Sequence, residues 1–381
     1  MDSEHDAAVV SRLQANFARF AEHDAFVDDP LYAAITAAVA QRPAWAALLA
    51  AAPATQRLPM LWLAALQERV LACVDAGERP PLADYFSSAG GARAPDDALV
   101  EHLGDFIEAQ RDALTRTIAM RSTQTNEIGR SAVLWPVLQS LVEASGRRSV
   151  ALLDVGCSAG LNLGVDHWRY RYIDDATGAT IATTPASRDA RAPEIACRVL
   201  AGARPTGTEH AQIVARQGID LAPIDVHDAA AVRWLRACLW PHDAERRARF
   251  DAAVAIARTQ AWPLAAVTDA AAAIAAWRAR LSDDVLPVVF NSWVLSYFDA
   301  PLLRGHLDVV LELVARHDVA WISAESPTLS RTWWPDKPAT TADTLPNATS
   351  WTVARPDGNG GIAWRLAATS HAHGRWMLYE G

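Results

Sequence analysis

Basic residues, cysteines and long apolar runs are all scarce in this sequence. Of its 381 residues, 35 are lysine or arginine and 44 are aspartate or glutamate, and Lys337 is the single lysine. The net charge of −9 argues against binding to nucleic acid or to an anionic membrane, because both need a basic surface. No uncharged apolar run reaches about 18 residues, so we expect no membrane-spanning helix.

The four cysteines, Cys73, Cys157, Cys197 and Cys238, form no C-x-x-C pair. Their wide spacing signals neither a zinc knuckle nor a redox dithiol and fits a reducing cytoplasm. The first residues are acidic and lack the basic and apolar segments of a secretory signal, so we expect a cytoplasmic protein. His371 and His373 have the spacing to share one strand face, but no third ligand is identifiable, and no metal site is expected.

Helical periodicity dominates the first part of the chain. Leu99, Leu103, Phe106, Leu114 and Ile118 recur at helical spacing, and no run before residue 145 alternates with period two. We therefore predict an all-α N-terminal cap domain over residues 1–145. Residues 1–146 hold 11 basic and 19 acidic groups, a net charge of −8, which leaves −1 for the rest. The second part is thus nearly neutral, and an acidic small substrate remains compatible with it.

After Gly146 the sequence pattern changes to short apolar runs that alternate with stretches of helical periodicity. Such alternation predicts an α/β fold with a parallel sheet covered on both faces. The chain then ends in an expected antiparallel hairpin with a last strand after it. The predicted strands are 149–155, 213–220, 264–269, 286–291 and 319–325, with a helix at 301–316, the hairpin at 350–355 and 362–367, and the last strand at 374–380.

The most informative stretch runs from Val150 to Leu163 and contains Asp154-Val-Gly156-Cys-Ser158-Ala-Gly160-Leu-Asn162. It predicts a buried strand, a tight glycine turn and the start of a helix, so that backbone N–H groups would face a ligand above the turn. Ligands of open α/β sheets bind at such positions.

Three interpretations compete for this turn. A dinucleotide-binding G-x-G-x-x-G pattern would need glycine where Ser158 and Leu161 stand. Gly156-Cys157-Ser158-Ala159-Gly160 matches the G-x-S-x-G nucleophile elbow of serine hydrolases, with Ser158 as nucleophile and His371 or His373 as base. That elbow normally follows several strands, whereas this one would end the first strand.

The third pattern, D-x-G-x-[GS]-x-G, resembles the first motif of class I S-adenosylmethionine-dependent methyltransferases. Asp220 in Gly218-Ile-Asp-Leu and Asp269 in Val267-Thr-Asp-Ala resemble the acids that follow the second and third strands of that family. Asn291 in Phe290-Asn-Ser-Trp occupies the fourth-strand position, and the final antiparallel pair fits the sheet of the family.

This resemblance implies a Rossmann-like methyltransferase-type domain over residues 146–381 and S-adenosylmethionine as cofactor. Asp154 would lie near the methionine end, Asp220 on the ribose and Asp269 on the adenine. The implied cofactor-binding residues are Asp154, Gly156, Ser158, Gly160, Asn162, Asp220, Asp269, Ala270 and Asn291. The methyl acceptor would be a small molecule.

One spacing departs from the methyltransferase pattern. Asp220 follows Asp154 by 220 − 154 = 66 positions, whereas such an acid usually follows by about 20. Either the chain has an insertion around 164–211, which we favour, or Asp174 or Asp175 takes the place of Asp220.

Candidate catalytic residues come from the strand ends and from one polar segment. Glu325 ends an apolar strand and would project toward the crevice as an acid or base. Asn291 lies at the neighbouring strand end, and Glu127, with Gln124, Asn126 and Arg130, belongs to a polar interruption that could line a lid or form an exposed helix face. The segment 326–346, with Trp333 and Trp334, would be either a mobile flap or a loop packed on the core.

A closer resemblance covers nearly the whole chain. The blocks Thr123-Gln-Thr-Asn-Glu127, Ser158-Ala-Gly-Leu-Asn-Leu163, Gly218-Ile-Asp-Leu-Ala-Pro223 and Trp234-Leu-Arg-Ala-Cys-Leu-Trp-Pro241 resemble those of an uncharacterised bacterial family. That family implies a Rossmann-like fold without an assigned reaction. A degenerate methyltransferase fold that binds without turnover is therefore the third functional hypothesis.

Overall fold

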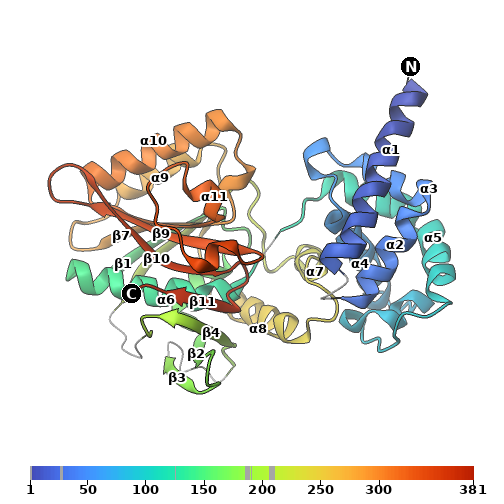
Figure 1. The fold of residues 1–381 in the computed structure, drawn as a ribbon, viewed down its shortest axis with the longest axis horizontal. Helices are drawn as coiled ribbons and strands as arrows, with labels where there is room; N and C mark the ends of the chain where they lie inside the picture. The colour runs from blue at the N-terminus through green and yellow to red at the C-terminus, as the bar shows by residue number, and fades with distance from the viewer. Residues whose placement is uncertain (1, 26–28, 125, 185–188, 190, 206–210) are drawn as a thin grey trace. The chain divides into compact units, whose positions relative to one another are not determined.

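The chain packs as two compact units (Figure 1). The structure, a computed structural model, describes residues 2–25, 29–124, 126–184, 189, 191–205 and 211–381. Unit 1 comprises residues 1–125 and 227–248, and unit 2 comprises residues 126–226 and 249–381. Helix α8 (Ala244–Gln260) continues through the division between residues 248 and 249.

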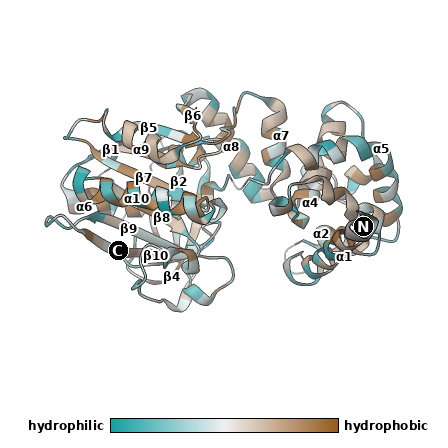
Figure 2. Ribbon diagram, turned by 90° about the horizontal axis from the view of Figure 1, so that it is seen from above, coloured by the Kyte–Doolittle hydropathy of each residue, from teal (hydrophilic) through white to brown (hydrophobic). Residues whose placement is uncertain are grey.

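Unit 1 consists of helices in its described part. Its α-helices are α1 (Asp2–Arg19), α2 (Pro30–Ala40), α3 (Pro43–Ala46), α4 (Pro59–Asp75), α5 (Leu99–Met120), α7 (Ala229–Ala237) and the first residues of α8. Helix α4 is buried along most of its length and is mainly hydrophobic in colour, whereas α5 carries hydrophilic residues on its exposed side (Figure 2). Central α4 therefore supplies the core against which the others pack.

A buried glutamine of α4 holds the end of α7. Gln67 is fully buried, and its Nε2 donates to the carbonyl oxygens of Ala237 and Leu239 at 3.1 and 2.8 Å. The last carbonyls of a helix have no partner within that helix, so a side-chain donor satisfies them. The Trp234–Pro241 block thus has a structural role within unit 1.

Unit 2 is built on one 11-stranded sheet in the order β3-β2-β4-β11-β10-β9-β8-β7-β1-β5-β6. Strands β6, β5, β1, β7 and β8 are parallel, and β9, β10 and β11 continue the sheet in antiparallel pairs. Strand bounds are β1 Ser149–Val155, β2 Arg169–Asp174, β3 Thr180–Thr184, β4 Glu194–Gly202, β5 Gln212–Asp220, β6 Leu264–Ala266, β7 Leu286–Ser292, β8 Ala320–Glu325, β9 Ala348–Pro356, β10 Ile362–His371 and β11 Trp376–Tyr379. A mixed α/β fold with a large, partly parallel sheet is therefore confirmed.

Helices cover both faces of this sheet. Helices α9 (Ala270–Arg278) and α10 (Ala300–His317) lie over one face and α6 (Ser131–Ser145) over the other (Figure 1). Leu153 and Val155 of β1 belong to the hydrophobic core that includes residues of α9 and α10. Because side chains alternate along a strand, Asp154 points to the face of α6.

The compact units have other bounds than the domains expected at 1–145 and 146–381. Helix α6 belongs to unit 2, because it packs on the sheet: Tyr172 and Tyr379 donate from their hydroxyls to the carbonyls of Ala132 and Pro136. Conversely, residues 227–248 belong to unit 1.

The stretch interpreted as an insertion around 164–211 contains β2, β3 and β4 in its described part, while 185–188, 190 and 206–210 lie outside the described residues. These strands extend the sheet beyond β11, because β4 pairs with β11 in parallel. Asp174 and Asp175 therefore lie far from β1, and Asp220, at the end of β5, is the acid on the strand next to it. The alternative with Asp174 or Asp175 in that place is wrong.

None of the helices in the described part of the chain is long and apolar enough to cross a membrane.

Candidate functional site

The glycine turn after β1 is the centre of the candidate site. Gly156, Ser158 and Gly160 all have left-handed backbone conformations, with φ values of 73°, 50° and 68°. Serine adopts this conformation at a cost that glycine does not bear, so Ser158 is held there by its surroundings. The tight turn expected from the sequence is confirmed.

Two glycines of the turn make room for close neighbours. A Cβ on Gly156 would lie 2.4 Å from Val294 Cγ2, and one on Gly160 would lie 2.6 Å from Leu264 Cδ2. The loop after β7 therefore packs directly on the loop after β1. The order in which strands are added to the sheet also reverses between β1 and β7. The next strands along the chain, β5 and β6, lie on one side of β1, and the later strands β7 and β8 lie on the other side.

The backbone amides of the turn are already used inside the protein. The N–H groups of Gly156 and Cys157 donate to Ile219 O at 2.8 and 3.2 Å, and that of Gly160 donates to Cys157 O at 2.7 Å. The two remaining amides donate to side chains: Ser158 N to Asp220 Oδ2 at 2.9 Å, and Ala159 N to Asn126 Oδ1 at 3.2 Å. The expectation that these amides face a ligand is therefore wrong.

The helix expected after the turn is a short 3₁₀ segment, Leu161–His167, with a kink at Gly164. A Cβ on Gly164 would lie 2.4 Å from atoms of both Trp168 and Trp262. The segment that directly follows the turn therefore supplies no α-helix N-terminus to it, because the chain enters β2 after this 3₁₀ segment. Asn162 lies in this segment, and its buried Oδ1 has no hydrogen-bond partner among the described residues.

Asp220 braces the turn from the end of β5. Its Oδ2 accepts from Ser158 N, and its Oδ1 accepts from Ala222 N at 3.0 Å. Each carboxylate oxygen has a second lone pair, so a half-buried Asp220 retains capacity to accept hydrogen bonds from a ligand.

Asp154, at the end of β1, is only 2% exposed. Its Oδ2 has no hydrogen-bond partner among the described residues. Burial and the nearby charge of Asp220 raise the pKa of Asp154 to about 8, against a lowering effect of Arg130. Near neutral pH this carboxyl is therefore largely protonated.

Asn291 and Glu325 form a buried network at the ends of β7 and β8. Asn291 Nδ2 donates to Glu325 Oε1 at 2.9 Å, and the backbone amides of Val294 and Leu295 donate to the same oxygen at 2.9 and 3.0 Å. The second Asn291 Nδ2 proton goes to Ser323 Oγ, and Asn291 Oδ1 accepts from Trp321 Nε1. Asn291 therefore has no amide proton left for a ligand.

Glu325 is fully buried, and its Oε2 has no hydrogen-bond partner among the described residues. Burial raises its pKa, while its three donors and the charge of Arg130 lower it. Through Val294, which packs on Gly156, Glu325 fixes the loop that touches the glycine turn.

The polar segment before α6 meets the same strand ends. Asn126 donates from Nδ2 to Ser158 Oγ at 2.6 Å, and buried Arg130 donates from Nε to Ala372 O at 2.7 Å. Glu127 is also buried and accepts from Gly129 N at 2.8 Å. Residues 126–130 of this segment are therefore packed into unit 2 and do not form an exposed helix face; Gln124 belongs to unit 1, and Thr125 lies outside the described residues.

Asp269 and Ala270 lie next to β6, at the start of α9. Asp269 is exposed and caps the helix by accepting from Ala272 N at 2.9 Å. An N-cap is a sufficient structural reason for an aspartate at this position.

The serine hydrolase interpretation depends on the partner of Ser158. The Asn126 amide is a hydrogen-bond donor to Ser158 Oγ, and an amide cannot remove the serine proton. His371 ends β10 and His373 lies in the turn that follows, where His373 N donates to His371 Nδ1 at 2.9 Å. The geometry thus gives Ser158 a role in the turn itself.

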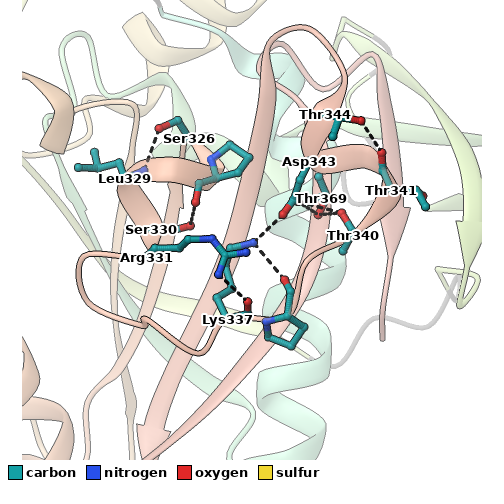
Figure 3. Close-up of polar contacts among 12 residues, drawn as sticks. Ser326, Leu329, Ser330, Arg331, Lys337, Thr340, Thr341, Asp343, Thr344 and Thr369 are labelled. Atoms are coloured by element: carbon teal, nitrogen blue, oxygen red, sulfur yellow. Dashed lines mark hydrogen bonds and ion pairs between the residues drawn. The ribbon is translucent and has the colours of Figure 1, made fainter.

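The segment 326–346 is a packed part of unit 2 (Figure 3). Lys337, fully buried, donates to Asp343 Oδ2 at 3.0 Å, and Asp343 Oδ1 accepts from Thr340 and Thr369. Trp333 is 6% exposed and donates to Thr352 Oγ1. Of the two interpretations left open, the loop packed on the core is the one observed.

The structure thus brings together the predicted residues Asp154, Gly156, Ser158, Gly160, Asp220, Asn291 and Glu325 around two touching loops. Ser292 was not among the predicted site residues; its buried Oγ has no partner among the described residues. Its position directly after Asn291 at a strand end was the available signal. No group of three or more His, Cys, Asp or Glu side chains suited to a metal ion occurs in the described part of the chain.

Fold and site together define an α/β protein with an acid-lined edge at the carboxyl ends of its parallel strands. The chain belongs to the family described as "Uncharacterized protein conserved in bacteria (DUF2332)", whose model matches residues 14–378. Comparisons with the curated proteins and with the solved structures found no match.

Proposed function

We propose that the protein is an S-adenosylmethionine-dependent methyltransferase that acts on a small molecule. Along the chain, the five parallel strands β1, β5, β6, β7 and β8 come first to fifth. Across the sheet, from β6 to β8, they lie in the order third, second, first, fourth, fifth. This is the order of Rossmann-type doubly wound sheets, whose ligands bind where the strand succession reverses. The observation that carries the proposal is the acid pair Asp154 and Asp220 on either side of the glycine turn at this point.

The charge of the site suits a cationic cofactor. Three carboxyl groups and one guanidinium lie here: Asp154 interacts with the charges of Asp220 and Arg130, and Glu325 interacts with that of Arg130. S-adenosylmethionine carries a sulfonium and an ammonium group against one carboxylate, so its net charge is opposite to the charge that Asp154 takes once it has lost its proton.

The same site suits a dinucleotide poorly. A pyrophosphate needs undonated backbone amides at the turn. The N–H groups of residues 156–160 are all donated within the protein. This difference favours S-adenosylmethionine over NAD or FAD.

Within this proposal, Asp154 receives the cationic end of the cofactor and Asp220 accepts from the ribose hydroxyls through its remaining lone pairs. Asn162 offers its unpartnered Oδ1, and Asp269 with Ala270 borders the adenine. When bound, the cofactor supplies an electrophilic methyl group. Glu325 and Glu127 are the proposed groups for holding a proton of the acceptor, and Asn291 orients Glu325.

A thermal-shift series tests this proposal with S-adenosylmethionine, S-adenosylhomocysteine and NAD⁺. A ligand at 100 times its Kd stabilises a fold by about 2.7 kcal/mol. We expect both adenosyl compounds to raise Tm and NAD⁺ to leave it unchanged. No shift with either compound at millimolar concentration would contradict the proposal, and binding without turnover of any acceptor would support the non-catalytic alternative instead.

A further inference from the structure

We infer that Asp154 is an uncharged carboxylic acid in the ligand-free protein, and that it releases its proton to solvent when a cationic group of the ligand is seated against it. Asp154 would then select ligands by charge. The identity of the cation rests on the proposed function, but the uncharged state of Asp154 does not.

The geometry around Asp154 leaves one of its carboxyl oxygens without a hydrogen-bond donor among the described residues. The side chain is buried on the α6 face of β1, and no donor lies within hydrogen-bond distance of Oδ2 among the described residues. An ionised carboxylate buried without donors is so unfavourable that the group takes up a proton instead.

The neighbouring acid differs from Asp154 in its hydrogen bonding. Asp220 accepts backbone N–H groups on both oxygens, whereas no donor reaches Asp154 Oδ2 among the described residues. The negative charge of Asp220 disfavours a second negative charge on the buried carboxyl, so it adds to the effect of burial on Asp154.

The other groups that face Asp154 do not reverse this balance. Arg130, from the segment before α6, lowers the pKa of Asp154 through its positive charge, and its guanidinium donates to the carbonyl oxygens of Ala372 and Ser292. Cys157, in the turn, has its thiol pKa raised by burial and by both acids, and is therefore neutral. Ser292, at the end of neighbouring β7, is uncharged. The pKa of Asp154 is accordingly raised to about 8.

A seated cation changes this electrostatic balance. A positive charge at the turn favours the ionised form of Asp154, so its proton leaves as the ligand binds. A neutral ligand of the same shape gains no such interaction. Cation binding must therefore tighten as the pH rises toward 8, by up to about tenfold per pH unit.

The first experiment counts protons by titration calorimetry with S-adenosylmethionine. Wild type and Asp154→Asn are each measured at pH 7 in two buffers of different ionisation enthalpy. We expect wild type to release about one proton more than Asp154→Asn at pH 7, and about none more at pH 9.5. Asp154→Asn is the control, because its proton count contains only the protons that the ligand and the other groups of the protein release or take up on binding. Equal proton counts for two proteins that both bind would overturn the inference.

The second experiment needs no ligand. Because the folded-state pKa is raised above 3.8, the stability that Asp154 contributes is present at low pH and is lost as the pH rises toward 8. Relative to Asp154→Asn, the unfolding equilibrium constant of wild type should rise by up to about tenfold per unit between pH 5 and 8, measured by urea denaturation. Parallel pH profiles for the two proteins would contradict the inference.

These outcomes separate the inference from the proposed function. If S-adenosylmethionine does not bind at any pH, the proposed function fails and the ligand-free profile alone decides the state of Asp154. If Asp154→Asn does not fold, a carbon-13 titration of the wild-type carboxyl groups replaces it. One aspartate that titrates near pH 8 would support the inference, and none above pH 6 would overturn it.

Discussion

The side-chain amide of Asn126 closes the glycine turn on Ser158: Nδ2 lies 2.6 Å from Ser158 Oγ, while Oδ1 accepts from Ala159 N. The orientation of the amide follows from its partners, because a backbone N–H requires the oxygen. Asn126 is also the first residue of unit 2. The residue that begins this unit thus shapes its candidate site.

Asn126→Ala removes both hydrogen bonds from this half-buried amide. We expect the free energy of unfolding to fall by about 1–2 kcal/mol, because a buried donor is left without a partner. Urea denaturation measures this change. Asn359→Ala, in the exposed turn between β9 and β10, is the matched control and should change stability by less than about 0.5 kcal/mol. Equal effects of the two substitutions would contradict the role of Asn126.

Glu325→Ala leaves the donors Asn291 Nδ2, Val294 N and Leu295 N without an acceptor. We expect a loss of about 3 kcal/mol or more in the free energy of unfolding. Glu325→Gln keeps an acceptor oxygen and should lose clearly less. Glu312→Ala, on the exposed side of α10, is the control. An equal loss for Glu325→Ala and Glu325→Gln would show that the acceptor is not what matters.

Lys337→Ala breaks a buried ion pair and leaves Asp343 without its cation. Breaking one side of a buried pair costs about 3–5 kcal/mol. The exposed pair of Arg316 and Glu312 provides the comparison, and Arg316→Ala should cost about 0–1 kcal/mol. Chemical denaturation of both variants tests this, and similar costs would refute the structural role assigned to Lys337.

His306 makes the stability of unit 2 sensitive to acid. It is 2% exposed, neither ring nitrogen has a partner among the described residues, and burial lowers its pKa from 6.5 to about 4. The unfolded state binds a proton first as the pH falls, so stability is lost between pH 6.5 and 4, by about 3 kcal/mol. His306→Leu should flatten that part of the pH profile, measured by urea denaturation at pH 7 and 4.5. An unchanged slope would contradict the assignment.

The parallel strands could be predicted from the sequence because β1, β7 and β8 are short buried apolar runs, while partly buried β5 carries an apolar run that ends in Gly-Ile-Asp. The predictions at 149–155, 213–220 and 286–291 correspond to β1, β5 and β7 within one residue at either end. Helix α10 was likewise predicted within one residue at each end. Local periodicity and Pro301 in the first turn sufficed for these elements.

The extension of the sheet was not readable, because it depends on a distant pairing. Strand β4 joins the sheet through β11, with Arg198 paired to Trp376. No local pattern in 164–211 encodes a partner so far along the chain.

The acceptors of the backbone amides in the turn could not be predicted from the sequence, for a similar reason. Gly156, Ser158 and Gly160 marked its position, but the acceptors of two of its amides are Asn126 and Asp220, each more than 30 residues away. Sequence spacing predicts where a turn lies and does not reveal which distant side chains satisfy it.

The most direct test of the account is where the methyl donor is held. The unmodified protein is cross-linked by ultraviolet light to methyl-tritiated S-adenosylmethionine and digested with trypsin, which releases peptides 149–169 and 217–233. We predict label in one or both peptides, competed by S-adenosylhomocysteine, reduced at least tenfold in Asp220→Asn and unchanged in the helix-cap control Asp299→Asn. Label confined to other peptides, or label that S-adenosylhomocysteine does not displace, would contradict the account.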